Sequence, residues 1–140
     1  MVAVILVEPR IPGNIGAVAR VMKNFDVKDL VLVNPQCDYR APEVGYRAKH
    51  AQDVLKKMKV IASFADVRKK FDCLVATTSK IGSDYNIARS PLSPEDGVTL
   101  LQKRKKVGLV LGSENDGLHN TEVQACDFVV SIPTAKKYPA

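Results

Sequence analysis

The 140-residue sequence contains no tryptophan, and aromatic residues make up only 6% of it. Stacking of many single-stranded bases on aromatic rings is therefore not the obvious way for this chain to bind a partner. No apolar run reaches the roughly 18 residues that span a bilayer. The strand-like start at Met1–Val7 lacks the basic region and cleavage site of a signal peptide. We therefore expect no membrane association.

Cysteine is also scarce. Cys37, Cys73 and Cys126 are widely spaced, and they form neither a CxxC pair nor a Cys/His cluster. This pattern argues against a disulfide framework and against a zinc site, so no metal is expected. Cys73 and Cys126 lie at or near the start of apolar runs, where buried free thiols are usual. Free thiols fit a reducing, cytoplasmic location.

Several catalytic and nucleotide-binding signatures are missing as well. GxGxxG does not follow the first apolar run, so a Rossmann dinucleotide site is not supported. GxxxxGK[ST] occurs nowhere, so the chain is not a P-loop NTPase. Nothing pairs a nucleophile with a base in a Ser-His-Asp or Cys-His arrangement. His50 and His119 are isolated, and each is more readily explained as a partly exposed structural histidine than as a general base.

What the chain does contain is a regular alternation of strand-like and helix-like segments without a hairpin signal. Predicted strands cover Val2–Val7, Leu30–Val33, Val60–Ala62, Cys73–Thr77, Val107–Leu111 and Phe128–Ile132. Predicted helices run from an N-cap at Asn14 to about Asp26, in two pieces from Glu43 to Met58, from Phe64 to Phe71, from Pro94 to about Lys105 and from about Asn120 to Ala125. The alternation predicts one α/β domain, a mostly parallel sheet with helices on both faces. A long loop is expected from Ile81 to Leu92.

The net charge is +6, with a sequence pI near 9.3. This favours acidic partners, with nucleic acid first, although a basic surface kept for solubility explains the charge equally well. One basic run is Lys103–Lys106. A second basic region comprises Arg40, Arg47, Lys49, Lys56, Lys57 and Lys59.

Four loops should meet at the carboxyl edge of such a sheet, where open α/β sheets bind ligands. They are Glu8–Asn14, Thr77–Leu92, Leu111–Asn120 and Ile132–Ala140. The third contains Gly-Ser-Glu-Asn-Asp-Gly, in which Gly112 and Gly117 permit a close approach or a positive φ. On its own such a turn is usually only a solvated loop. Glu114 is nevertheless the best candidate for a functional carboxylate, because it follows a buried strand.

Two further residues lie on the first predicted helix. Asn14, taken alone, is best explained as a helix cap. Arg20 flanks the apolar side of the helix, where it is either an exposed arginine or a clamp for phosphate or carboxylate.

Two motifs together resemble a known family. Residues 12–25, PGNIGAVARVMKNF, followed by LVLVNP at 30–35, are similar to the first motif of SpoU/TrmH-type RNA 2′-O-ribose methyltransferases of the SPOUT superfamily. Residues 107–118, VGLVLGSENDGL, followed by SIPT at 131–134, resemble the second motif. The TrmJ-like tRNA methyltransferases are the most similar branch, because of the MKNF segment, Asp53–Leu55, and the Thr-Ser-Lys segment followed by Arg89-x-x-Leu92.

The resemblance implies a C-terminal trefoil knot, S-adenosylmethionine as cofactor, and a homodimer with its site at the subunit interface. The substrate implied is a ribose 2′-hydroxyl, in a TrmJ-like enzyme that of a pyrimidine in the tRNA anticodon loop. Matching the family motifs assigns Asn14 to ordering the active-site loop, Arg20 to activating the hydroxyl and Glu114 to the neighbourhood of the ribose. The segments matching the cofactor-binding ones contain Thr77, Thr78, Ser79, Leu111, Gly112, Gly117, Leu118, Ile132 and Pro133.

The family's third motif, an Asn-Leu-Ser-like segment that opens a C-terminal helix, would begin after Tyr138-Pro139-Ala140. We therefore expect residues 1–140 to form a single SPOUT domain lacking that helix. Two alternatives stay open: an rRNA 2′-O-methyltransferase, and a non-catalytic RNA-binding module of the same fold.

Overall fold

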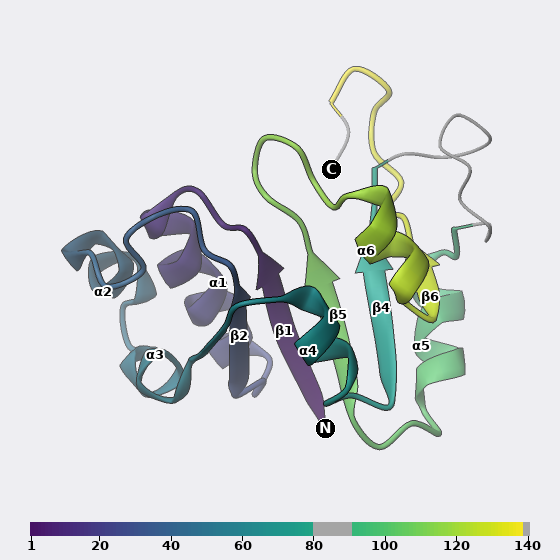
Figure 1. Cartoon of the computed structure of the whole chain (residues 1–140), viewed down its shortest axis with the longest axis horizontal. Helices are drawn as coiled ribbons and strands as arrows, with labels where there is room; N and C mark the ends of the chain where they lie inside the picture. Colours follow the sequence, from purple (N-terminus) through teal and green to yellow (C-terminus); the bar gives the residue numbers. More distant parts are fainter. Residues whose placement is uncertain (80–90, 139–140) are drawn as a thin grey trace.

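The computed structural model describes residues 1–79 and 91–138, so the predicted loop Ile81–Leu92 falls almost entirely outside the described residues. Six parallel strands form one sheet in the order β3-β2-β1-β5-β4-β6 (Figure 1). Their bounds are β1 Val2–Val7, β2 Asp29–Val33, β3 Lys59–Ile61, β4 Cys73–Thr77, β5 Val107–Leu111 and β6 Phe128–Val130. The six predicted strands are thus confirmed to within one or two residues.

The described helices are α1 Pro12–Asn24, α2 Pro42–Ala48, α3 Gln52–Lys57, α4 Phe64–Arg68, α5 Pro94–Leu101 and α6 Asn120–Ala125. The predicted division of 43–58 into two pieces is confirmed. Within the described ranges 1–79 and 91–138, no helix is long and apolar enough to cross a bilayer.

Four predicted boundaries are wrong. Helix α4 ends at Arg68 and not at Phe71. The N-cap position of α1 is Ile11 and not Asn14, because Pro12 supplies a preset φ for the first helical residue. Helix α5 ends at Leu101, four residues early, and the Lys106 backbone is instead paired with Asp72, through N···Oδ2 at 2.9 Å. Strand β6 ends at Val130 and not at Ile132, and the next amide, that of Ser131, donates to the carbonyl of Leu92, outside the named strands.

Alternate residues of each strand point to opposite faces, and each face is covered by its own helices (Figure 1). On one face the buried strand residues Val4, Leu6, Leu30 and Leu32 pack with α1, α2 and α3, and α5 covers the same face beside β4. On the other, Ile5, Val7, Val31, Val33, Leu74, Ala76, Val110 and Val129 pack with α4 and α6. The predicted parallel α/β sheet with helices on both faces is therefore confirmed. The trefoil knot stays a prediction.

Helices α1 and α2 pack closely at Gly16. A Cβ placed on this residue would lie 2.1 Å from the Val44 carbonyl oxygen and 2.9 Å from the Arg47 Cβ. Gly45, on α2, is different, since an added Cβ there meets nothing within 4 Å. The two glycines therefore form a matched pair of helical positions, one crowded and one open.

We expect Gly16→Ala to lower the free energy of unfolding by about 1–3 kcal/mol, because α2 must shift to admit the methyl group. Gly45→Ala should leave the protein unchanged or stabilise it by up to about 1 kcal/mol through helix propensity. Urea denaturation of both variants checks this, and equal effects would contradict the close approach at Gly16.

Candidate active site

The loops that follow β1 and β5 leave the sheet side by side, because these strands pair directly, with Leu6 opposite Leu111. In the sheet, β2 and β3 lie on one side of β1, whereas β5, β4 and β6 lie on its other side, so the order of the strands changes direction between β1 and β5. Such a change of direction in a parallel sheet opens a crevice at the carboxyl edge, where ligands bind in open α/β folds.

The Glu114 carboxylate joins these two loops. Its Oε2 accepts a hydrogen bond from the Arg10 backbone N–H at 2.8 Å. Its Oε1 accepts from the Ile11 backbone N–H at 3.2 Å and from Nδ2 of Asn14 at 3.1 Å. The Asn14 side chain thus serves Glu114 and not the helix end. We call this arrangement of Glu114, Arg10, Ile11 and Asn14 the carboxylate clamp.

The clamp favours the ionised carboxylate. Partial burial raises the pKa of Glu114, but the hydrogen bonds from the Arg10 backbone, within the Glu114 turn, from Asn14 and from Ile11 outweigh it. The pKa therefore lies below its ordinary value of 4.5. Hydrogen bonds to a charged acceptor are stronger than neutral ones. The two loops are consequently held together most firmly when Glu114 is charged.

The turn that presents Glu114 depends on glycine at both ends. A Cβ on Gly112 would lie 2.1 Å from the Gly117 carbonyl carbon, so a side chain cannot be accommodated. Gly117 itself has φ +68°, which a residue without Cβ adopts freely. Buried Ser113 ties the turn together: its Oγ accepts from the Asp116 N–H at 3.1 Å and its carbonyl from the Gly117 N–H at 3.0 Å.

Arg10 and Ser113 are site residues that the sequence prediction missed. Besides its backbone bond to Glu114, Arg10 places its guanidinium 3.2 Å from Oδ2 of Asp116. This exposed ion pair is a second link between the same two loops. The local sequence carries no sign of it, because its partners lie 106 positions apart. Ser113 was detectable in principle, since a serine opening a glycine-bounded turn commonly bonds backbone N–H groups.

A cavity of about 570 Å³ adjoins the Gly112–Gly117 turn. It is lined by eight of the nine residues proposed to bind a cofactor: Thr77, Thr78, Ser79, Leu111, Gly112, Gly117, Leu118 and Ile132. Pro133 is not among the lining residues, whereas Glu114 is. Residues from the ends of β4, β5 and β6 thus share one hollow. Neither histidine lines it, and Nε2 of His119 instead lies 3.7 Å from Oε2 of Glu8.

Arg20 lies elsewhere. It is exposed on α1, six residues after Asn14 and therefore about 9 Å further along the helix axis. It lines no part of the cavity. Within residues 1–79 and 91–138, no hydrogen bond or ion pair holds its guanidinium. In the single chain, the proposed catalytic arginine is thus separate from Glu114 and from the cavity.

The cavity suits a nucleoside with a charged tail. Its volume is within the roughly 300–1,000 Å³ range of ligand pockets. Leu118, Val130 and Ile132 offer apolar contacts for a base, and Glu114 and Asp116 add negative charge that complements a sulfonium. Beside the Ile132 wall, the buried Ser131 Oγ has no hydrogen-bond partner among the described residues. The residues present therefore fit S-adenosylmethionine.

Comparison with known proteins matches residues 1–140 to the SpoU rRNA Methylase family. The chain belongs to this family. It is 38% identical over 140 residues to the tRNA (cytidine-2'-O-)-methyltransferase TrmJ of Methanocaldococcus jannaschii, covering 99% of this chain and 60% of that protein. The chain thus spans about three fifths of that relative.

Solved structures agree with this assignment. TrmJ from Z. mobilis superposes with a TM-score of 0.87 at 29% identity, over 98% of this chain and 60% of that one. The SpoU methyltransferase AviRb from Streptomyces viridochromogenes, in complex with AdoMet, has a TM-score of 0.69 at 21% identity, over 99% of this chain and 50% of that one. The second likeness shows the fold alone.

We expect Glu114→Gln to lower the free energy of unfolding by about 1 kcal/mol at pH 7. The effect is smaller than for a buried charge, because the side chain is exposed. Since the folded-state pKa is depressed, this stabilisation is complete above pH 4.5 and is lost as the pH falls through the folded pKa.

Thermal denaturation of the wild type and Glu114→Gln is measured between pH 7 and pH 3. The melting temperatures of the two proteins, plotted against pH, should converge below pH 4.5. The matched control is Asp29→Asn, because Asp29 is exposed and no described residue bonds to its side chain. If the melting temperatures of the wild type and Glu114→Gln differ by the same amount at pH 7 and at pH 3, the clamp is contradicted.

Proposed function

We propose that the protein transfers a methyl group from S-adenosylmethionine to a ribose 2′-hydroxyl of RNA, that of a pyrimidine in the tRNA anticodon loop. The observation that carries this proposal is the carboxylate clamp, which fixes the first-motif loop against the second-motif turn beside a nucleoside-sized cavity. Family membership and the similarity to tRNA 2′-O-methyltransferases support the reaction and the substrate.

The cofactor, when bound, supplies an already activated sulfonium methyl group. The protein must then align a 2′-oxygen with it and remove a proton. In this proposal the cofactor is held by the cavity residues, among them Thr77, Leu111 and Ile132. Glu114 fixes Asn14 and the loop that faces the ribose. Arginine is a poor base because its pKa exceeds about 12. Arg20 therefore stabilises the developing alkoxide and grips a phosphate, while a substrate phosphate accepts the proton.

A homodimer would bring Arg20 to a site that its own chain does not reach. An apolar groove of about 600 Å³ runs between α1 and the β1–β5 face of the sheet, from Val2 and Phe25 to Gly112 and Glu114. On its α1 side, Val21 is 53% exposed and Phe25 76%. Contiguous apolar surface of this kind marks interaction sites. We propose that a second copy covers this groove and places its Arg20 beside the partner's Glu114.

A cytoplasmic location is also proposed. Its support is that Cys37, Cys73 and Cys126 are all free thiols, as a reducing compartment maintains them.

We expect the protein to label tRNA from methyl-labelled S-adenosylmethionine, with the label recovered as a 2′-O-methylated nucleoside after nuclease digestion. Arg20→Ala should lower kcat/KM at least about 100-fold, because the charge on the reacting oxygen loses its stabilising cation. Melting temperature should not change, since Arg20 is exposed and no described residue bonds to its side chain.

Lys69→Ala is the control, because it removes one exposed cation from the end of α4. If the wild type leaves every 2′-hydroxyl unmodified, the enzymatic proposal is wrong. Labelling of rRNA instead of tRNA would reassign the substrate. RNA binding with no heat on titration of S-adenosylmethionine would favour a non-catalytic module.

For the dimer, we expect Val21→Asp to convert the assembly to monomers in sedimentation velocity, because it places a charge in the apolar groove. Val98→Asp is the matched control: Val98 is 59% exposed on α5 and does not line the groove. A monomeric wild type, or equal behaviour of the two variants, would contradict the proposed interface.

A further inference from the structure

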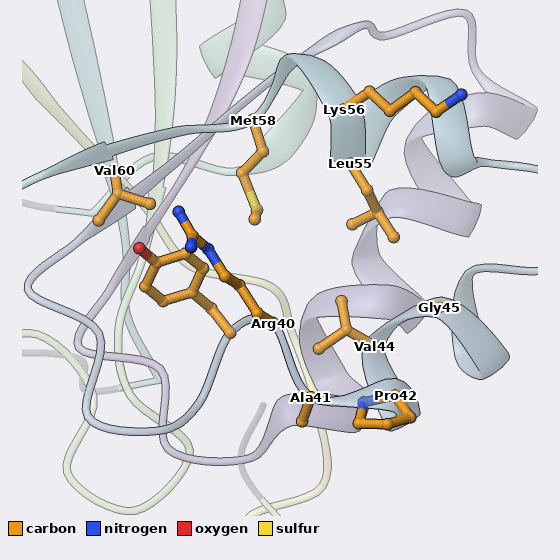
Figure 2. A pocket seen from close by; sticks show the side chains of 10 residues that line it. Arg40, Ala41, Pro42, Val44, Gly45, Leu55, Lys56, Met58 and Val60 are labelled. Atoms are coloured by element: carbon orange, nitrogen blue, oxygen red, sulfur yellow. The ribbon is translucent and has the colours of Figure 1, made fainter.

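A third pocket, of about 620 Å³, opens beside the outer strand β3 (Figure 2). It is enclosed by the segment Tyr39–Pro42, the first turns of α2, the end of α3 and Val60 of β3. None of its lining residues belongs to the cavity next to Glu114. The predicted function leaves this pocket unassigned.

The lining combines cations with apolar walls and contains no carboxylate. The guanidinium carbon of Arg40 lies 5.6 Å from the centroid of the Tyr39 ring, a cation–π arrangement. Figure 2 shows the Arg40 guanidinium directed toward Met58 and Val60, whereas Lys56 extends away along α3 at the rim. No ion pair holds Arg40 within the described part of the chain, so its charge is available to an anion.

This combination suits a nucleotide better than a simple anion. A flat base can stack on the Tyr39 ring or the Arg40 guanidinium, with Met58 and Val60 as apolar contacts. Arginine and lysine then bind the adjoining phosphates. The chain has few aromatics, which excludes long stacking platforms, but one ring suffices for one base.

The pocket is linked to the candidate active site through one loop. The Gln36 N–H donates to the Pro9 carbonyl at 2.9 Å, immediately before Arg10 of the clamp. Burial, and next the Glu114 carboxylate, raise the pKa of the Cys37 thiol, so this residue also lies close to the clamp. Tyr39 and Arg40 follow after one intervening residue, Asp38. An RNA strand that leaves the reacting ribose along this loop would reach the pocket.

We propose that this pocket binds a nucleotide of the substrate RNA next to the one that is methylated, with its base against Tyr39 and Arg40 and its phosphates near Arg40 and Lys56. This assignment rests on the proposed function, because it takes RNA as the substrate. Of the second basic region of the sequence, Arg40 and Lys56 line this pocket, and Arg40 has a defined aromatic contact with Tyr39.

The test compares Tyr39→Leu and Arg40→Gln with the control Lys70→Ala. Arg40→Gln keeps a polar side chain at an exposed position, and Lys70→Ala removes one exposed cation that does not line the pocket. Each pocket variant should raise KM for tRNA about tenfold, the size of one lost base–side-chain stack, and leave kcat and S-adenosylhomocysteine affinity unchanged. The Tyr39 ring packs against the core, so melting curves are used to verify that Tyr39→Leu is folded.

The same variants are measured for equilibrium binding of a fluorescent anticodon stem-loop RNA, which separates this inference from the proposed function. Binding that is weaker in both pocket variants than in Lys70→Ala supports the site even if no methyl group is transferred. Equal Kd values in all three variants overturn the site while methylation stands. A wild type that binds no RNA overturns both. Polyglutamate has charge but no bases. If it displaces the fluorescent RNA as well as unlabelled RNA does, the proposed base stacking is overturned.

Discussion

The rest of the site depends on a single carboxylate. Glu114 accepts hydrogen bonds from Arg10, Ile11 and Asn14, residues that precede it by 100 to 104 positions. The parallel pairing of β1 with β5 makes this contact possible, because it starts the two loops side by side. Without Glu114, two backbone N–H groups and an amide would lose a charged acceptor. The loop Glu8–Asn14 would then be free to separate from the Gly112–Gly117 turn.

Glu114 and the turn that carries it have different roles in the proposed site. Glu114 accepts hydrogen bonds from the loop that contains Asn14, and the turn that carries it, from Gly112 to Leu118, also lines the nucleoside-sized cavity. Gly112 cannot carry a side chain there, since its Cβ would collide with Gly117. A positioning role for Glu114 and a binding role for the turn therefore follow from one geometry. In the dimer that we propose, the arginine for the reaction comes from the second copy.

The fold was largely predictable because β1, β2, β4 and β5 are apolar runs that are mostly buried on both faces, a signal contained within each segment. The site was predictable only where its signal is local. Asn14 looked like a helix cap, since a single sequence does not reveal an acceptor a hundred positions away. Arg10 was missed for the same reason. The predicted end of α5 at about Lys105 is wrong, and the next residue, Lys106, donates its backbone N–H to Asp72 in another contact across the sequence.

The most direct test of the clamp is hydrogen exchange at the Arg10 and Ile11 backbone amides, followed by NMR at pH 7 in the wild type and in Glu114→Ala. These amides point at the carboxylate and take part in no helix or strand. We predict slow exchange in the wild type and fast exchange in the variant, with the amides of β1 and β5 unchanged. Equal exchange of both amides in the two proteins would contradict the central role of Glu114.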